Sequence, residues 1–275
     1  MKNRHLFISI ASLSVLFLFS VSVFLSGRTA LCVSKSGETP HYRVILFAGQ
    51  SNMFGMDPLQ EPYSEAMLGH HRFANLRDDT DLPKRGIGPA NSMMKALIET
   101  FPDEHFIFVM FAVGGSNVKE WGPDRSTGFT VQYKDETSTF YEVLLKGIEE
   151  AVDGRDVSCA ALVWMQGEAD SRELELAENY DKNFDRFYRS LQKDLGVVDL
   201  PLIIGEVNPP LKTHRYRETV RTLQVKMAQK YANAVLVDTD DLAKLEDELH
   251  YTAAADIILG KRFFEAYMQL MRHSH

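Results

Sequence analysis

The chain carries the stretch VILFAGQSNM at residues 44–53. Its first five residues form an apolar run typical of a buried strand, and the glycine and polar residues that follow are typical of a tight turn. A serine in the turn that ends a buried strand is held at the rim of a sheet, where a substrate can reach its hydroxyl and a base can take its proton. Ser51 is therefore a candidate nucleophile, although Gly, Ser and Asn also build such turns for backbone reasons alone.

Apolar runs recur along the rest of the chain and alternate with amphipathic stretches. Strands are predicted at residues 43–48, 105–113, 160–165, 202–206 and 234–238, because these runs lack the polar alternation of a half-exposed strand. Helices are predicted at residues 89–100, 138–152, 171–195, 217–231 and 252–271. Strand followed by helix, five times over, predicts an α/β fold with a five-stranded parallel sheet between two helical layers. In such sheets the ligand binds at the carboxyl ends of the strands.

Composition bounds the class of protein. The chain has 275 residues, of which 45% are hydrophobic and 25% charged. These values suit one globular domain of about 230 residues behind an unusual N-terminus. The formal net charge of −8 and the absence of a Lys/Arg cluster argue against a nucleic-acid partner.

The N-terminus has the pattern of an export signal. A basic start with Lys2 and Arg4 precedes an apolar stretch at residues 6–25, which places the positive charges on the cytoplasmic side and the rest of the chain outside the cytosol. We divide the chain into a leader at residues 1–33, a linker at 34–41 and a catalytic domain at 42–275. Cleavage of the leader is favoured, and a retained single-pass membrane anchor through residues 6–25 is the alternative.

Two cysteines, Cys32 and Cys159, are the only ones in the chain. They could pair in an oxidising compartment, but a buried free thiol is the expected state of Cys159. Neither cysteine has the spacing of a zinc site.

The loop after the second predicted strand contains Gly114 and Gly115. Adjacent glycines let the backbone turn with its amides outward, which suits a donor to an oxyanion, although a loose turn would look the same. No Walker pattern and no G-x-G-x-x-G motif is present, so a nucleotide is not expected.

The third predicted strand runs into QGEAD at residues 166–170. The amide of Gln166 could point a donor N–H at the same oxyanion. Glu168 and Asp170 also invite a glycosidase interpretation with paired carboxylates. Asp170 is better explained as the cap of the next helix, which leaves Glu168 without a partner.

An acidic segment near the C-terminus ends in DELH at residues 247–250. An aspartate three residues before a histidine, on a loop that enters a helix, can accept the Nδ1 proton while Nε2 faces a serine. Asp247 and His250 are thus the candidate orienter and general base. A calcium site is not favoured, because the regular oxygen spacing and the turn glycine of an EF-hand are missing.

In this order, GQSNM, the Gly114–Gly115 loop closed by Glu120 and Trp121, QGEAD and Asp247-x-x-His250 resemble the carbohydrate esterase family 6 branch of the SGNH hydrolases. This group contains sialic-acid-specific acetylesterases and acetylxylan esterases, and the resemblance covers about residues 43–270. It implies a flavodoxin-like three-layer α/β/α sandwich and a serine esterase that removes acetyl groups from carbohydrate, and with it we expect no metal and no cofactor.

The resemblance also implies roles. Ser51 would be the nucleophile, His250 the base and Asp247 its orienter. The backbone amides of Ser51 and Gly115 (or Gly114) and the side chain of Gln166 would form the oxyanion hole. Substrate contacts are expected from Gln50, Asn52, Trp121 and Glu168. Met165, where the branch usually has His or Tyr, and Glu248, where Gly is usual, could reshape the sugar pocket.

Two rival functions are a carbohydrate O-acetyltransferase that uses the same acyl-serine, and a non-catalytic glycan-binding domain. The identity of the sugar is left open. Aromatic side chains that could stack on a sugar ring are Tyr63, Trp121, Phe129 and Tyr133. Sialic acid would need a cationic partner for its carboxylate, for which Arg72, Arg77 and Arg125 are candidates, whereas xylan would need none.

Overall fold

A computed structural model describes residues 30–32, 40–57, 65–76, 87–125, 129–134 and 136–273 of the chain. Most of the expected leader and linker lie outside these residues, as do Tyr63 and Arg77. Within the described residues, no helix combines the length and the apolar character needed to cross a membrane.

The central sheet is parallel and has six strands in the order β2-β3-β1-β6-β7-β8. The strands are β1 (His41–Gly49), β2 (Arg72–Asn75), β3 (His105–Ala112), β6 (Asp156–Met165), β7 (Leu202–Gly205) and β8 (Ala234–Val237). All five predicted strands are present. The additional strand β2 is a short edge strand whose residues are exposed or half-buried, so it lacks the apolar run that marks the others.

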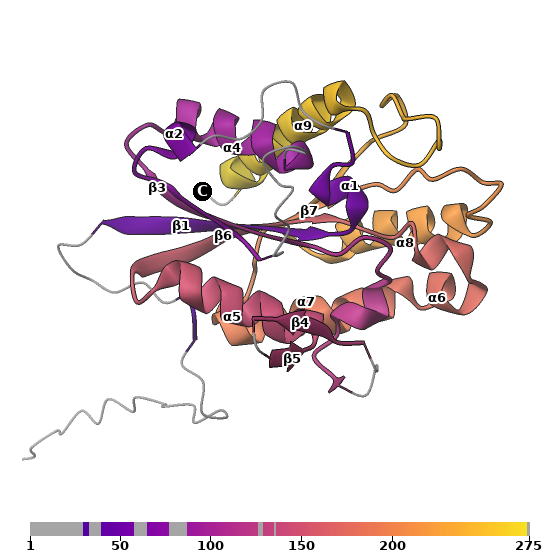
Figure 1. The fold of residues 1–275 in the computed structure, drawn as a ribbon, viewed down its shortest axis with the longest axis horizontal. Helices are drawn as coiled ribbons and strands as arrows, with labels where there is room; N and C mark the ends of the chain where they lie inside the picture. Colours follow the sequence, from indigo (N-terminus) through magenta and orange to yellow (C-terminus); the bar gives the residue numbers. More distant parts are fainter. Residues whose placement is uncertain are drawn as a thin grey trace, which may run out of the picture.

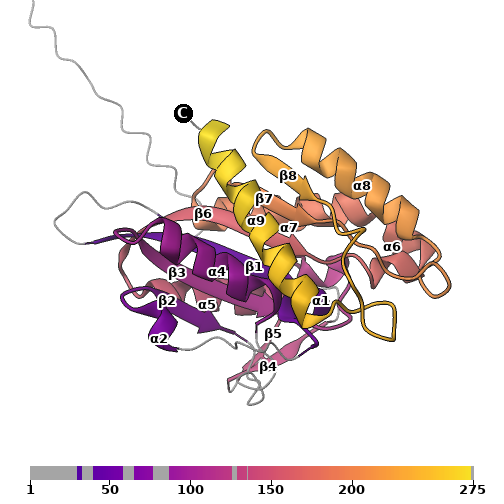
Figure 2. The ribbon, with the colours of Figure 1, turned by 90° about the horizontal axis from the view of Figure 1, so that it is seen from above.

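Helices cover both faces of the sheet (Figures 1 and 2). One face carries α4 (Gly88–Thr100) and α9 (Ala253–His273), and the other carries α5 (Phe140–Val152), α7 (Tyr180–Leu195) and α8 (Arg217–Lys230). Short elements are α1 (Ser51–Phe54), α2 (Glu65–Leu68), α6 (Leu174–Glu178), the 3-10 turns η1 (Val118–Trp121) and η3 (Asp170–Arg172), and the hairpin of β4 (Val131–Tyr133) and β5 (Glu136–Ser138). The three-layer α/β/α fold is the expected one.

Strand β1 shows why the sheet is sandwiched. Its side chains alternate between two apolar cores, with Val44 and Leu46 in the core beneath α5 and α7 and Ile45 and Phe47 in the core beneath α4 and α9. All four are fully buried, which is why the strand is a continuous apolar run without polar alternation.

The predicted helix at residues 171–195 is instead three elements, η3, α6 and α7. Glu173 has an extended backbone between the first two, and Leu174, which falls near the helical spacing of the predicted helix, is 47% exposed. Asp170 caps no helix, because its carboxylate is buried and turned towards another loop. Phe184, Phe187 and Leu191 also fall near helical spacing, and these three side chains are buried on α7.

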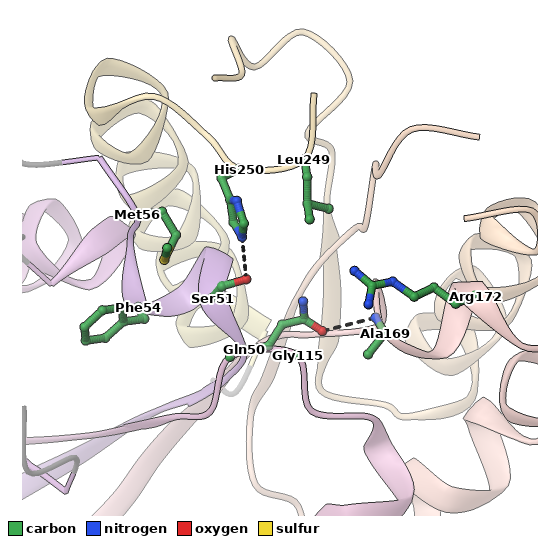
Figure 3. A pocket seen from close by; sticks show the side chains of 10 residues that line it. Gln50, Ser51, Phe54, Met56, Gly115, Ala169, Arg172, Leu249 and His250 are labelled. Atoms are coloured by element: carbon green, nitrogen blue, oxygen red, sulfur yellow. Dashed lines mark hydrogen bonds between the residues drawn. The ribbon is translucent and has the colours of Figure 1, made fainter. Parts of the chain in front are cut away.

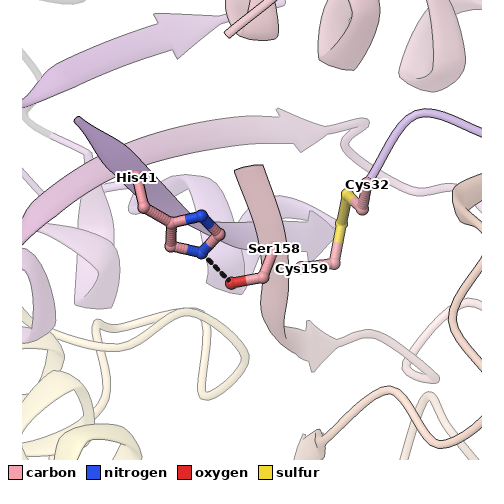
Figure 4. Close-up of a disulfide and its surroundings, with 4 residues drawn as sticks. All are labelled: Cys32, His41, Ser158 and Cys159. Atoms are coloured by element: carbon pink, nitrogen blue, oxygen red, sulfur yellow. Dashed lines mark hydrogen bonds between the residues drawn. A yellow bond between two sulfur atoms is a disulfide. The ribbon is translucent and has the colours of Figure 1, made fainter. Parts of the chain in front are cut away.

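Cys32 and Cys159 form a disulfide, with their Cα atoms 5.6 Å apart, so the expectation of a free thiol at Cys159 is wrong (Figure 4). The pairing follows from the path of the segment before β1, since the backbone N–H of Cys32 donates to the carbonyl of Leu195 at the end of α7, 3.0 Å away. This contact brings Cys32 to β6, which a linear sequence does not reveal.

Breaking this disulfide is expected to lower the free energy of unfolding by about 2 to 5 kcal/mol, because the bond closes a long loop. The measurement is denaturant unfolding of the wild type with and without dithiothreitol, and of the Cys32→Ala/Cys159→Ala double variant, which should unfold alike under both conditions. Two free thiols per chain in the native, non-reduced protein would contradict the pairing.

Candidate active site

Ser51 lies where β1 ends, at the carboxyl edge of the sheet. Gly49 permits the turn, because a Cβ atom at this position would lie 2.0 Å from the carbonyl oxygen of Met165 in the neighbouring strand. The chain then enters α1 with Ser51 as its first residue. The sharp strand-to-helix turn presents the serine hydroxyl at the rim, as the sequence predicted.

The loop before α9 brings His250 to this serine. His250 Nε2 lies 2.9 Å from Ser51 Oγ, and His250 Nδ1 lies 2.6 Å from Asp247 Oδ2. The other carboxylate oxygen of Asp247 accepts the backbone N–H groups of Leu249 and His250, each at 2.9 Å. These bonds hold the carboxylate against the ring within a four-residue turn.

The protonation state of this chain of groups follows from its electrostatics. Burial opposes the charge of Asp247, but the backbone N–H groups of His250 and Leu249 outweigh it and hold the pKa of Asp247 below its usual range. An ionised carboxylate only accepts, so Nδ1 of His250 carries the ring proton. Nε2 is then the acceptor for the Ser51 hydroxyl, which is the arrangement that a general base requires.

Glu248 has a left-handed backbone, with φ of 56°. Glycine adopts this conformation at no steric cost, which explains why glycine is usual here in the family that the sequence resembles. In this chain the turn is maintained with a glutamate, and Asp247 and His250 still meet.

Ser51 lines a pocket of about 310 Å³ (Figure 3). Apolar side chains of Phe54, Met56 and Leu249 form part of its wall. The remaining lining residues are Gln50, Ser51, Gly114, Gly115, Ala169, Arg172 and His250. The pocket thus joins loops that follow β1, β3 and β6 with the histidine loop.

Several N–H groups at this pocket lack an acceptor within the described residues. They include the backbone amides of Ser51, Gly114 and Gly115. Gly115 has a φ of +71°, and the space beside it is open. The side chain of Gln50 receives the Ala169 N–H on Oε1 at 3.4 Å, and Figure 3 shows its amide nitrogen turned into the pocket.

Gln166 does not occupy the predicted oxyanion position. Its Nε2 group donates to the carbonyl of Ser116 at 2.8 Å and to Asp170 Oδ2 at 2.5 Å, and the side chain is fully buried outside the pocket lining. Asp170 in turn accepts the backbone N–H of Val118. Gln166 and Asp170 therefore hold the loop that follows β3 through its Ser116 carbonyl and its Val118 N–H.

Three of the four residues that were expected to contact the substrate instead make their contacts within the protein. Asn52 Nδ2 donates to Glu168 Oε1 at 2.6 Å and to the Leu249 carbonyl at 3.2 Å, which ties the nucleophile turn to β6 and to the histidine loop. Trp121 is fully buried, and its Nε1 donates to Ser116 Oγ at 3.1 Å. Of the four residues, only Gln50 lines the pocket.

The other aromatic and cationic candidates that the structure describes lie elsewhere. Phe129, Tyr133, Arg72 and Arg125 are absent from the described pocket lining, and Arg125 pairs with Glu142 at 2.7 Å. The sequence did not single out Phe54, Met56, Arg172 or Leu249. All four stand within a few residues of a predicted motif, and proximity to the motifs is the signal that could have found them.

The acidic segment before His250 is neutralised by arginines. Asp240 pairs with Arg221 at 2.8 Å, and Asp241 pairs with Arg262 at 2.7 Å. Among the residues that the structure describes, no cluster of histidine, cysteine and acidic side chains is arranged to hold a metal ion.

Buried carboxyl groups surround the site. Burial raises the pKa of Asp170 to about 7, raises that of Glu168 and raises that of Asp256 well above its usual range. The folded state therefore keeps these protons at pH values where the unfolded chain has lost them, and their contribution to stability is lost as the pH rises towards and through the folded pKa values.

We expect the melting temperature to fall between pH 5 and pH 8 for this reason, and Asp256→Asn to reduce the fall. Neither carboxyl oxygen of Asp256 has a hydrogen-bond partner in the described structure, so the amide avoids the charge at little cost. The matched control is Asp103→Asn, at an exposed aspartate. An equal effect of Asp256→Asn at both pH values would contradict the expectation.

The chain is thus a three-layer α/β protein whose parallel sheet carries a Ser-His-Asp chain of hydrogen bonds at its carboxyl edge. Residues 41–269 match the model of the family described as carbohydrate esterase, sialic acid-specific acetylesterase. The chain belongs to this family.

A curated relative is a probable carbohydrate esterase of Arabidopsis thaliana, 30% identical over 186 residues, which are 66% of this chain and 64% of the relative. The match thus spans less than two thirds of that relative's length.

Solved structures show the same fold. The X-ray structure of the Arabidopsis protein has a TM-score of 0.66 at 23% identity, covering 82% of this chain and 98% of that one. The structure of NanS has a TM-score of 0.64 at 17% identity, covering 86% and 99%. A carbohydrate acetylesterase from Xanthomonas citri has a TM-score of 0.62 at 18% identity, covering 82% and 56%.

Proposed function

We propose that this protein is a serine esterase that removes O-acetyl groups from carbohydrate through an acetyl-serine intermediate. The observation that carries the proposal is the unbroken chain from Ser51 Oγ to His250 Nε2, at 2.9 Å, and from His250 Nδ1 to Asp247 Oδ2, at 2.6 Å, at the wall of a pocket. Family membership supports an acetylated carbohydrate as the substrate.

In the first half of the reaction, His250 Nε2 takes the Ser51 proton while Oγ attacks the acetyl carbonyl carbon. The resulting oxyanion accepts N–H groups from the backbone of Ser51 and Gly115, or Gly114 in its place. The amide of Gln50 replaces Gln166 as the third donor, because the Gln166 amide is already engaged. The bond to the sugar oxygen then breaks, and His250 returns the proton to that oxygen.

In the second half, a water molecule gives a proton to His250 and attacks the acetyl-serine, which releases acetate and restores the Ser51 hydroxyl. The apolar side chains of Phe54 and Met56 offer contacts to the acetyl methyl group.

We also propose that the catalytic domain works outside the cytosol. The basic and apolar leader and the disulfide between Cys32 and Cys159 both support export, since disulfides persist in oxidising compartments. Leader cleavage remains our proposal over a membrane anchor.

The test is acetate release by the domain from acetylated xylan, from O-acetylated sialosides and from a small aryl acetate. Hydrolysis is expected for the aryl acetate and at least one sugar ester. An acceptor sugar in the assay separates hydrolysis from acetyl transfer, because free acetate is measured against transferred acetyl. No acetate and no transfer from any substrate would refute the proposal.

A further inference from the structure

The pocket has one permanently charged wall residue within the described lining, Arg172. It stands in η3, on the loop that follows β6, and Figure 3 shows its guanidinium turned towards the pocket that Ser51 and His250 also line. No carboxylate among the described residues forms an ion pair with it. A cation without an acidic partner is unexpected at the active site of a chain with a net charge of −8.

A buried histidine holds this arginine. Arg172 Nε lies 3.1 Å from His214 Nε2, and His214 is only 1% exposed. Because a guanidinium only donates, His214 Nε2 must accept, so its ring proton is on Nδ1 and faces Thr213 Oγ1 at 2.8 Å. Burial, and then the charge of Arg172, lower the pKa of His214, so the ring is neutral when it accepts.

This arrangement leaves the outer edge of the guanidinium available. The Nε group is used by His214, while no described residue accepts from the terminal nitrogens. Two parallel N–H donors in a fixed plane match the two oxygens of a carboxylate. The guanidinium of Arg125, in contrast, forms an ion pair with Glu142 outside the pocket.

We propose that Arg172 binds a carboxylate on the sugar that carries the acetyl ester, and that His214 is the positioning residue that aims it. The inference rests on the proposed esterase function and names its preferred substrates as acidic sugars. Uronic acids and sialic acids share the required carboxylate.

The test compares substrates that differ only in charge. For each enzyme variant, kcat/KM is measured on O-acetylated glucuronic acid and on its methyl ester, and separately on an O-acetylated sialic acid and its methyl ester. The wild type should prefer the free acid in at least one pair, and the pair that shows the preference identifies the source of the carboxylate. Arg172→Gln should reduce this preference by about 10- to 100-fold, mainly through KM.

Three further variants separate the positioning of the guanidinium from its charge. Arg125→Gln, which removes an arginine outside the pocket lining, should leave the preference intact. His214→Phe should weaken it although Arg172 is still present, and His214→Gln, whose side-chain oxygen can accept from Nε, should restore part of it. The preference is a ratio of two rates on one protein sample, so partial unfolding of a variant does not change it.

A binding measurement keeps this inference separate from the esterase proposal. Calorimetric titration of the Ser51→Ala protein with glucuronate and with sialate should show binding of at least one acid that Arg172→Gln removes, whether or not any ester is hydrolysed. Equal kcat/KM for acid and methyl ester in both pairs would overturn the inference while acetate release leaves the esterase standing. A preference that survives Arg172→Gln would also overturn it.

Discussion

Replacing Ser51 with alanine is expected to lower kcat for acetyl ester hydrolysis by about 10⁴- to 10⁶-fold, because the covalent route is lost and only the oxyanion donors and binding remain. The same variant should no longer be labelled by a fluorophosphonate, which modifies an activated serine. Steady-state rates on an aryl acetate and mass spectrometry of the labelled protein measure both effects. Fold integrity is followed by the melting temperature, which should change little.

The chain contains a matched control for this experiment. Ser158 Oγ lies 2.9 Å from His41 Nε2 (Figure 4). His41 Nδ1 lies 3.0 Å from Asp156 Oδ2, so the three residues repeat the hydrogen bonds of the proposed site. They stand at the amino ends of β1 and β6, opposite Ser51. Ser158 lies within a strand and has no glycine turn of the kind found at Ser51.

Ser158→Ala is therefore expected to keep full activity and full labelling at Ser51. A serine with the hydrogen bonds of a catalytic triad is not an effective nucleophile unless N–H donors are also placed to bind the oxyanion. Labelling of Ser158 in place of Ser51, or activity that survives Ser51→Ala and disappears with Ser158→Ala, would move the catalytic site to the other edge of the sheet.

Gln50→Ala is expected to lower kcat by about 10²- to 10³-fold, the usual cost of one oxyanion donor, with a small change in melting temperature. Within the described residues the side chain of Gln50 makes one hydrogen bond, which it accepts from the Ala169 N–H, and its amide nitrogen faces the pocket. The measurement is kcat on an aryl acetate together with thermal unfolding. Gln50→Glu provides the isosteric comparison, because it keeps the volume and removes the donor.

Gln166→Ala should show the opposite pattern. It removes two buried hydrogen bonds, to Ser116 and Asp170, and we expect a loss of about 2 to 4 kcal/mol in the free energy of unfolding. If Gln50→Ala keeps kcat while Gln166→Ala loses it at an unchanged melting temperature, Gln166 would be the donor after all.

Prediction from sequence succeeded best where an element is long and buried. The run at residues 44–48 and its four counterparts have both faces covered, so each was visible as an uninterrupted apolar segment. Strand β2 was missed because its four residues are exposed or half-buried and begin and end with the polar Arg72 and Asn75, so they form no apolar run. The break before α7 was missed because Leu174 fits the helical period and only the path of the loop exposes it.

Within the site, spacing along the sequence was sufficient to predict the positions of some residues and insufficient to predict those of others. Asp247 and His250 are three residues apart, so one turn joins them, and Gly49 to Ser51 define a turn by their own backbone needs. Trp121 and Gln166 stand in the other two motifs, and both are buried by neighbouring segments and have a structural role. Burial depends on what packs against a side chain, and a motif does not contain that information.

The sequence by itself determined the layered parallel fold, the strand end that carries Ser51 and the pairing of Asp247 with His250, since each depends on periodicity or on contacts a few residues apart. Only the tertiary structure decided which side chains share the pocket with Ser51. Arg172 reaches the pocket from the loop after β6 and contacts His214 from another loop, and Cys32 reaches Cys159 across 127 residues. Such long-range meetings follow from how the strands are ordered in the sheet and how the loops pack above it, which no short stretch of residues encodes.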